Sequence, residues 1–297
     1  MMTDHGVRVT QAGLVAATDD GIWSSDGSRT LGGHRVDDLD GAWALLDGDA
    51  LWRDGVEQVR LPGPAATCVA APGDGVLVGT KEAHLLSVKG GVAEPLESFE
   101  KAEGRDRWYT PWGGPPDVRT VAAAPDGTLY VNVHVGGILR SDDGGSSWSP
   151  TIDVDADVHE VLAHGESDVL AATALGFARS HDRGRTWTYA TAGLVGTYSR
   201  AIAVAGDWLL LSASTGPFTG QAAVYRRPLD ADDDVPFERC SDWFTANVNT
   251  GRLAGGDGPQ AAMASPDGDL YVSDDAGATW RQVAAGLGTV NRLRLST

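Results

Sequence analysis

The sequence predicts an all-β protein in which copies of one small β unit stack side by side. An eight-residue phrase of the form Ser-x-Asp-x-Gly-x-Thr/Ser-Trp occurs at residues 141–148, 180–187 and 273–280. A fourth copy at residues 24–31 has serine in place of the glycine and leucine in place of the tryptophan. Short apolar runs of strand length lie between the copies, and 39 of the 297 residues are glycine. A turn phrase that recurs among such runs indicates a repeated β unit.

The chemistry of the phrase favours a structural turn over a catalytic group. Its aspartates can accept hydrogen bonds from the backbone N–H groups of a tight turn. The glycine tolerates a positive φ, and the tryptophan begins the next strand as a large apolar side chain. We therefore expect a structural role for the four aspartates, which are Asp26, Asp143, Asp182 and Asp275.

The phrase resembles the Asp-box, or BNR repeat, of the sialidase-like β-propellers. That superfamily also includes sortilin-type receptors, xyloglucanases and the photosystem II assembly-factor propellers. The resemblance implies a β-propeller that takes up nearly the whole chain. It implies no particular activity, because Asp-boxes lie far from the active site in these families.

The length is suited to one propeller domain spanning residues 1–297. Seven blades, each a four-stranded antiparallel sheet, would contain about 42 residues apiece. Six blades are the alternative, in which a compact second blade fuses with its neighbour. The one break in the spacing is an insertion loop at residues 100–116, between blades three and four.

Runs of strand length separated by turn residues place the blades along the chain. Blade four is the clearest, with strands at 118–125, 128–135 and 138–141 and a fourth around Trp148. Blade five repeats this pattern. The strands expected elsewhere are 13–21 and 22–25 in blade one, 42–48, 50–55 and 56–62 in blade two, 67–72, 75–80 and 84–88 in blade three, 158–165, 168–175, 177–180 and 185–190 in blade five, and 199–206 and 207–214 in blade six, with blade seven at 244–285.

Blade one lacks an inner strand of its own in this layout. Residues 290–296 have the pattern of an inner strand, so we expect the C-terminal end to close the ring beside the N-terminal segment. Closure of this kind removes the exposed edges that an open sheet would leave. The rival prediction is that residues 7–10 supply that strand.

The charge balance is strongly acidic, with a net charge of −18 and a pI near 4.6. This field disfavours nucleic acid and anionic membrane surfaces as partners. The simpler interpretation is a solvated acidic shell. The more specific hypothesis is adaptation to a high-salt, halophilic cytoplasm, where salt relieves the self-repulsion of such a surface.

A cytoplasmic location is also the expectation from the remaining features of the sequence. No apolar stretch is long enough for a transmembrane helix, and the first residues lack the pattern of a signal peptide. The two cysteines, Cys68 and Cys240, fall in different repeats, so buried free thiols are expected rather than a disulfide.

Polar pairs open the inner strands of four consecutive blades. They are Asp117 and Arg119, Asp157 and His159, Tyr198 and Arg200, and Asn247 and Asn249. Residues at i and i+2 of a strand point the same way, so these pairs are expected to meet at one mouth of the central channel. That mouth lies on the face opposite the Asp-boxes, because the d–a and b–c loops share one face of a propeller. A purely structural inner strand would carry small apolar residues instead.

Further candidates for a ligand site fall on the same face. The second strand of blade four adds Asn132 and His134, and the b–c loop of blade six adds Ser214, Thr215 and Phe218. The insertion loop adds the aromatic residues Trp108, Tyr109 and Trp112. Aromatic rings beside polar groups suit a sugar or a peptide, so the sequence predicts a site for a polar small molecule, a glycan or a protein partner.

Two enzymatic alternatives stay open beside this binding function. One is a glycoside hydrolase or lyase of sialidase-like ancestry, in which Arg119, Arg200 and Arg292 form a cationic cluster, with Tyr198 near and Asp117 or Asp157 as the acid. The early Phe/Tyr-Arg-Ile-Pro signature of sialidases is absent from the sequence. The other is a metal-dependent hydrolase or lyase that uses His134, His159 and Asp157. No cofactor is predicted apart from this alternative divalent metal.

Overall fold

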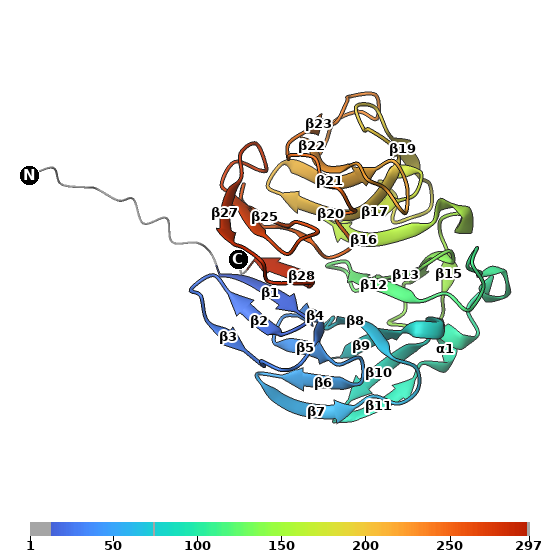
Figure 1. Ribbon diagram of the computed structural model, residues 1–297. Coiled ribbons are helices and arrows are strands. Elements are labelled where there is room, and N and C mark those ends of the chain that lie inside the picture. Colours follow the sequence, from blue (N-terminus) through green and yellow to red (C-terminus); the bar gives the residue numbers. More distant parts are fainter. Residues whose placement is uncertain (1–12, 74, 296–297) are drawn as a thin grey trace, which may run out of the picture.

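The chain forms a seven-bladed β-propeller, as the sequence predicts (Figure 1). The structure is a computed structural model, and it describes residues 13–73 and 75–295. Seven four-stranded antiparallel sheets follow one another around a central axis. A short helix, α1 (Glu97–Glu100), follows β11 and ends where the insertion loop between blades three and four begins.

Each blade runs from an inner strand at the axis to an outer strand at the rim. Blade one contains β28 (Val290–Leu295), β1 (Leu14–Thr18), β2 (Gly21–Ser24) and β3 (Arg29–Thr30). Blade two contains β4 (Val36–Asp40), β5 (Trp43–Leu46), β6 (Ala50–Arg53) and β7 (Val56–Arg60). Blade three contains β8 (Ala66–Ala70), β9 (Val76–Thr80), β10 (Leu85–Lys89) and β11 (Val92–Pro95). Blades four and five contain β12 (Val118–Ala123), β13 (Leu129–Val133), β14 (Gly137–Ser141) and β15 (Ser149–Pro150); and β16 (Val158–His164), β17 (Asp168–Thr173), β18 (Gly176–Ser180) and β19 (Thr188–Ala190). Blades six and seven contain β20 (Tyr198–Ala205), β21 (Trp208–Ser214), β22 (Ala222–Pro228) and β23 (Glu238–Arg239); and β24 (Leu253–Gly255), β25 (Ala261–Ala264), β26 (Leu270–Ser273) and β27 (Arg281–Ala284).

The antiparallel order gives the ring two distinct faces. We call the face where the inner strands begin the upper face, and the face where they end the lower face. The eight-residue phrases connect third to fourth strands, so they lie on the lower face. Of the described helices, α1 included, none has the length and apolar character needed to cross a lipid bilayer.

The repeated phrase forms the self-capped turn that its chemistry predicts. In the copy of blade five, one carboxylate oxygen of Asp182 accepts hydrogen bonds from the backbone N–H of Thr186 at 2.8 Å and from the hydroxyl of Ser180 at 2.8 Å. The other oxygen accepts the Thr186 hydroxyl at 2.7 Å. These hydrogen bonds lower the pKa of Asp182 to about 2. Asp143 and Asp275 make the same bonds, whereas Asp26 accepts the backbone N–H of Ser28 at 2.8 Å.

The tryptophan of each full copy packs toward the preceding blade. The indole N–H of Trp187 donates to the carbonyl oxygen of Thr151 at 2.9 Å, and that of Trp148 donates to the Ser98 hydroxyl at 3.3 Å. Trp280 packs with Leu210 and Cys240 of blade six. The phrase therefore fixes a turn within one blade and also joins two blades.

The C-terminal strand closes the ring, as the sequence predicts. The inner strand β28 pairs antiparallel with β1 over Leu14–Thr18, so the first blade is built from both ends of the described chain. The rival segment, residues 7–10, lies outside the described residues.

Arg292 in the closing strand holds two carboxylates across the axis. Its Nε donates to Asp38 of β4 at 2.6 Å, and its Nη1 donates to Glu160 of β16 at 2.8 Å. Burial by itself would lower the pKa of Arg292, but the two carboxylates raise it well above the usual range. This three-residue cluster, which we call the axial clasp, links blades one, two and five.

Blade two differs from the layout drawn from the sequence. Its inner strand is β4 (Val36–Asp40), whereas the sequence analysis began this blade at residue 42. Three of the five residues of β4 are aspartates, so the strand does not resemble an apolar inner strand. Asp38 is nevertheless buried, because it pairs with Arg292 and accepts the backbone N–H of Val69 at 2.9 Å.

Replacement of Arg292 by alanine is expected to lower the free energy of unfolding by about 3–5 kcal/mol, because it leaves two buried carboxylates without their partner. Urea unfolding measures this change. The matched control is Arg29→Ala, which breaks the exposed ion pair with Asp20 in the same blade. That change should cost less than about 1 kcal/mol. Equal losses in the two variants would contradict a stabilising role of the axial clasp.

Candidate functional site

The upper mouth of the channel contains a hollow of about 430 Å³. Residues from five blades line it, and they include Asp117, Arg119, Thr250, Asn291 and Arg292. The axial clasp lies beneath this hollow, because Arg292 lines it and also binds Asp38 and Glu160. The hollow is therefore a cup at the upper face.

Backbone bulges bring the predicted polar side chains to this mouth. The pairing of inner and second strands shifts by one residue at Arg119 in blade four and at His159 in blade five, and it shifts again between Ser199 and Ile202 in blade six. A bulged residue leaves the ladder and its side chain is re-aimed. The regular i, i+2 alternation assumed from the sequence is thus broken at the residues that form the site.

The first half of the site is a hydrogen-bonded chain from blade four to blade five. Arg119 Nη2 donates to Nδ1 of His134 at 3.1 Å, and Nε2 of His134 lies 3.1 Å from Oδ1 of Asp157. A guanidinium can only donate, so Nδ1 must accept and the proton of His134 is on Nε2. Asp157 is placed by a left-handed backbone conformation with φ of 47° just before β16.

The second half of the site runs from blade five to blade seven. His159 Nδ1 donates to the carbonyl oxygen of Ser199 at 2.7 Å, so its Nε2 accepts the hydroxyl of Tyr198 at 3.1 Å. The Tyr198 oxygen in turn accepts Nη2 of Arg200 at 3.3 Å. Arg200 Nη1 donates to the side-chain oxygen of Asn249 at 2.7 Å. Only 3.6 Å separates His159 Nε2 from Asp157 Oδ2, so the two halves form one polar network.

A row of rings follows the same path. The ring centroids of Trp112 and His134 are 5.2 Å apart, those of His134 and His159 are 5.9 Å apart, and those of His159 and Tyr198 are 4.8 Å apart. Trp112 is 70% exposed, whereas His159 is fully buried. The row therefore leads from an exposed indole on the insertion loop into the interior of the network.

Burial and the two arginines control the charge of this network. Burial lowers the pKa of His159 to about 3, and the charges of Arg119 and Arg200 act in the same direction against Asp157. Burial and the nearby Arg200 also lower the pKa of Arg119. Burial raises the pKa of Asp157, but the hydrogen bond from His134 and nearby positive charge outweigh it, so the net pKa is low. The network thus holds neutral His159 beside an ionised carboxylate.

Neither Arg119 nor Arg200 forms an ion pair with a carboxylate in the part of the chain that the structure describes. Their acceptors are His134, Asn249 and the Tyr198 hydroxyl. Ion pairs with carboxylates hold other arginines, such as Arg183 and Arg294. Asp157 and Asp117 lie close enough to raise the pKa of Arg119, but neither makes a direct ion pair with it, so its guanidinium keeps donors for a further acceptor.

The proton arrangement does not suit a metal ion at His134, Asp157 and His159. Their ligand atoms lie within 4.8 Å of one another, which is compact enough for a metal site. A metal-binding histidine normally donates its other ring N–H to an acceptor, as His159 does to Ser199. His134 instead accepts Arg119 at that nitrogen, so a metal at Nε2 would require an imidazolate beside two guanidiniums. These residues therefore do not support the metal-dependent alternative.

The remaining candidates divide into loop supports and exposed rings. Asn247 donates to the carbonyl oxygens of Gly216 and Pro217 at 3.2 and 3.0 Å, and the Ser214 hydroxyl donates to the carbonyl oxygen of Tyr198 at 3.2 Å. Thr215 bonds the Thr219 hydroxyl at 2.6 Å within the same loop. These bonds position the loop whose Phe218 is 100% exposed. Tyr109 is also exposed, and its hydroxyl donates to Asp155 at 3.1 Å.

Two predicted site residues are enclosed instead of facing the mouth. Trp108 packs against Phe99, with ring centroids 5.7 Å apart, and lies under the guanidinium of Arg105. Asn132 is fully buried, and no described residue bonds its amide. Asn132 was predicted from alternation along a strand, which cannot distinguish a residue at the mouth from one between two blades. Trp108 was predicted from its place on the insertion loop, where it is half-buried against Phe99.

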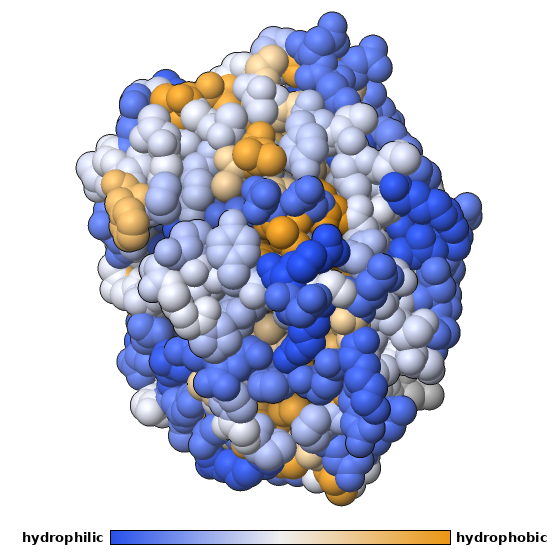
Figure 2. Space-filling view, turned by 90° about the vertical axis from the view of Figure 1, so that its right-hand side faces the viewer, coloured by the Kyte–Doolittle hydropathy of each residue, from blue (hydrophilic) through white to orange (hydrophobic). Residues whose placement is uncertain are grey.

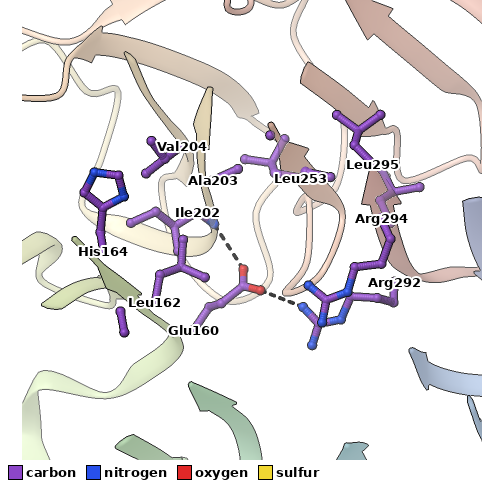
Figure 3. Close-up of a pocket in the computed structure, with 14 residues that line it drawn as sticks. Glu160, Leu162, His164, Ile202, Ala203, Val204, Leu253, Arg292, Arg294 and Leu295 are labelled. Carbon is purple, nitrogen blue, oxygen red and sulfur yellow. Dashed lines mark hydrogen bonds and ion pairs between the residues drawn. The ribbon is translucent and has the colours of Figure 1, made fainter. Parts of the chain in front are cut away.

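The sequence analysis also missed Glu160 and Asp38, the buried carboxylates of the axial clasp. Glu160 accepts Arg292 and the backbone N–H of Ile202, the latter at 3.0 Å (Figure 3). Burial raises the pKa of Glu160, and the charge of Arg292 opposes this. A hollow of about 260 Å³ on the other side of Glu160 is lined by Leu162, Ile202 and Leu253 together with the charged side chains of Arg292 and Arg294. The sequence did contain one signal for Glu160, because it follows His159 directly in a predicted inner strand.

The exterior of the molecule is largely hydrophilic. Figure 2 shows one side of the ring, where hydrophilic side chains cover most of the surface and apolar ones form small separate patches.

Comparison with known proteins identifies the fold. No protein-family model matches the sequence, and no curated protein matches it. Among solved structures, YCF48 from Cyanidioschyzon merolae is 16% identical with a TM-score of 0.55, over 96% of this chain and 88% of that one. A structure described as YCF48 bound to D1 peptide is 13% identical with a TM-score of 0.52, over 90% and 92%.

A GH74 enzyme of Niastella koreensis is 13% identical with a TM-score of 0.58. The match covers 92% of this chain and 47% of that one, so this chain spans about half the length of that enzyme. The protein is therefore a β-propeller of the kind found in YCF48 and GH74 structures, and identities this low show the fold alone.

The free energy of unfolding should decrease as the pH is lowered, and part of this decrease should depend on His159. The unfolded chain takes up a proton at the histidine near its usual pKa of 6.5, but the folded protein does so only near 3. Stability is therefore fully present above 6.5 and is lost as the pH falls toward 3, by about 1.4 kcal/mol per pH unit. In His159→Gln this part of the slope should disappear from urea unfolding at stepped pH.

The control is His181→Gln, since His181 is exposed on the lower face beside Asp168. It should leave the slope unchanged. An unchanged slope in His159→Gln would show that this histidine is not held neutral.

Proposed function

We propose that this protein is a binding propeller that holds a polar ligand at the upper mouth, with a carboxylate of the ligand at Arg119 and Arg200. A peptide segment of a protein partner is the ligand class we favour, and an acidic glycan is the alternative. No chemical reaction is part of this proposal.

The observation that carries the proposal is a pair of neighbouring arginines, of which Arg119 lines the 430 Å³ hollow and Arg200 lies near Arg119. The network of His134, His159 and Tyr198 fixes the direction of the two guanidiniums while neutralising neither. Arginine presents paired N–H groups that match a carboxylate, so an anion is the natural occupant. Preorganised donors of this kind reduce the entropy that binding would otherwise cost.

Exposed rings around the mouth supply the apolar part of the binding surface. Trp112 and Phe218 come from two loops of the upper face and are 70% and 100% exposed. Rigid aromatic side chains bury much surface at a low entropic cost, so they serve as anchors in peptide and protein recognition. A solved propeller of the same fold carries a peptide, which supports the choice of ligand class.

The arrangement offers less to the glycosidase alternative. That alternative needs Arg292 to join Arg119 and Arg200, yet Asp38 and Glu160 already neutralise Arg292. The Tyr198 hydroxyl bonds His159 and Arg200 and has no described carboxylate partner that could activate it. The geometry therefore favours binding over sialidase-type chemistry.

Replacement of both Arg119 and Arg200 by glutamine should reduce ligand retention at least tenfold. Peptide arrays with free and amidated C-termini, together with arrays of acidic glycans, give the measurement. Wild-type protein should prefer carboxylate-bearing probes. The control Arg183→Gln removes a lower-face arginine that pairs with Asp126, and it should bind as the wild type does.

A thermal melt establishes that the double variant is folded before its binding is compared. Retention of the same probes by the double variant would place the binding site elsewhere. A signal confined to the glycan arrays would assign the mouth to carbohydrate.

We also propose that the acidic surface suits a salt-rich cytoplasm. With a net charge of −18, salt should weaken the self-repulsion of the folded state. The melting temperature should therefore rise between low and high KCl concentrations. The same melts in a sugar of equal osmolarity control for solvent exclusion. A melting temperature that is indifferent to KCl would contradict this proposal.

A further inference from the structure

The lower-face turns of blades one, two, three and six lack the tryptophan that the other three blades carry. In blades four, five and seven, the lower-face turn carries the phrase, and its tryptophan packs toward the preceding blade. The turn of blade two, between β6 and β7, is only Asp54 and Gly55. It contains no tryptophan, so nothing from this turn covers the lower part of blade one.

A hollow of about 840 Å³ lies at this interface, larger than the hollow at the upper mouth. We call it the notch. Its walls come from blades one and two, which are adjacent in Figure 1. Half-buried apolar side chains form its floor, namely Val15, Ile22, Leu31 and Trp43. Apolar groups that are neither fully packed nor fully exposed typify a docking surface.

The rim of the notch is acidic. Asp26, Asp40 and Asp54 line it, together with one cation, Arg294. Arg294 lies 3.4 Å from Asp40, which leaves the other two carboxylates to set the local charge. Arg53 lies 3.6 Å from Asp54, but both side chains are more than half exposed, so water and salt weaken this pair. Hydrogen bonds from Ser28 lower the pKa of Asp26, which stays ionised.

We propose that the notch is a docking site for an exposed segment of a partner protein, in which one tryptophan is flanked by lysine or arginine. The apolar floor accepts the indole, as the grooves filled by Trp148, Trp187 and Trp280 do within the chain. The acidic rim attracts the flanking cations. This site lies on the lower face, so it is separate from the function proposed for the upper mouth.

Binding of dye-labelled peptides, followed by fluorescence anisotropy, tests the proposal. The probe is a capped peptide with the sequence Lys-Lys-Trp-Lys-Lys. The matched peptides are Glu-Glu-Trp-Glu-Glu, which reverses the charge, and Lys-Lys-Ser-Lys-Lys, which removes the indole. Wild-type protein should bind the first peptide at least tenfold more tightly than either of the others.

Three variants locate the binding. Ala42→Arg places a bulky cation at an exposed position of the notch, and it should weaken binding at least tenfold. Asp26→Asn combined with Asp54→Asn removes two rim charges but keeps side chains that tolerate these turns, and it should weaken binding three- to tenfold. The matched control is Glu94→Gln with Asp106→Asn, two exposed acids distant from the notch in sequence, which should change nothing.

The experiments distinguish a failure of the notch proposal from a failure of the function proposed for the upper mouth. The Arg119 and Arg200 double variant should bind the Lys-Lys-Trp-Lys-Lys peptide as the wild type does. Absence of saturable binding by wild-type protein would overturn the proposal, and so would equal binding of the three peptides. Binding seen only after deletion of residues 1–12 would assign the notch to the chain's own N-terminal segment. A dimer that Ala42→Arg dissociates would assign it to a second copy.

Discussion

The axial clasp is the interaction on which the remainder of the structure depends. A propeller is stable only when its last sheet is completed, and here that requires β28 from one end of the chain to pair with β1 from the other. Arg292 of β28 then binds carboxylates of blades two and five, so the closing strand is attached across the axis as well as along its edge. Because all three side chains are almost fully buried, removal of one partner leaves an uncompensated charge.

The clasp also separates the two ends of the channel. Above it, the hollow at the upper mouth is bordered by polar side chains that the bulged inner strands re-aim. On the other side of Glu160, leucine and isoleucine side chains and the two arginines of the closing strand line a second hollow (Figure 3). The buried cluster thus lies between a hollow on the upper face and a second hollow, and the Asp-containing turns lie on the lower face.

Repetition explains the regular turns on part of the lower face. The phrase caps its own turn and supplies a tryptophan to the blade before it, so each full copy performs two tasks. Blade two has neither the phrase nor the tryptophan, and the notch lies beside its short lower-face turn. At the mouth, His134 accepts a hydrogen bond from Arg119, and His159 and Arg200 both bond the Tyr198 hydroxyl, so these contacts orient the guanidiniums without a carboxylate. In the notch, an apolar surface has no tryptophan over it. At the mouth, two guanidiniums have no carboxylate in direct contact.

The sequence by itself determined the β-propeller, its seven blades, the capped turns and the strand that closes the ring. These follow from local chemistry, since an aspartate, a glycine and a tryptophan at fixed spacing specify the same turn wherever they occur. It also brought most residues of the mouth together, because Arg119, His159, Arg200 and Asn249 open inner strands of neighbouring blades. Only the tertiary structure decided that Asp38 and Glu160 meet Arg292, that Trp108 and Asn132 are enclosed, and which ring nitrogens carry protons. The clasp depends on contacts between residues more than a hundred positions apart, and the mouth depends on bulges and on contacts between blades. No local pattern in the sequence encodes either.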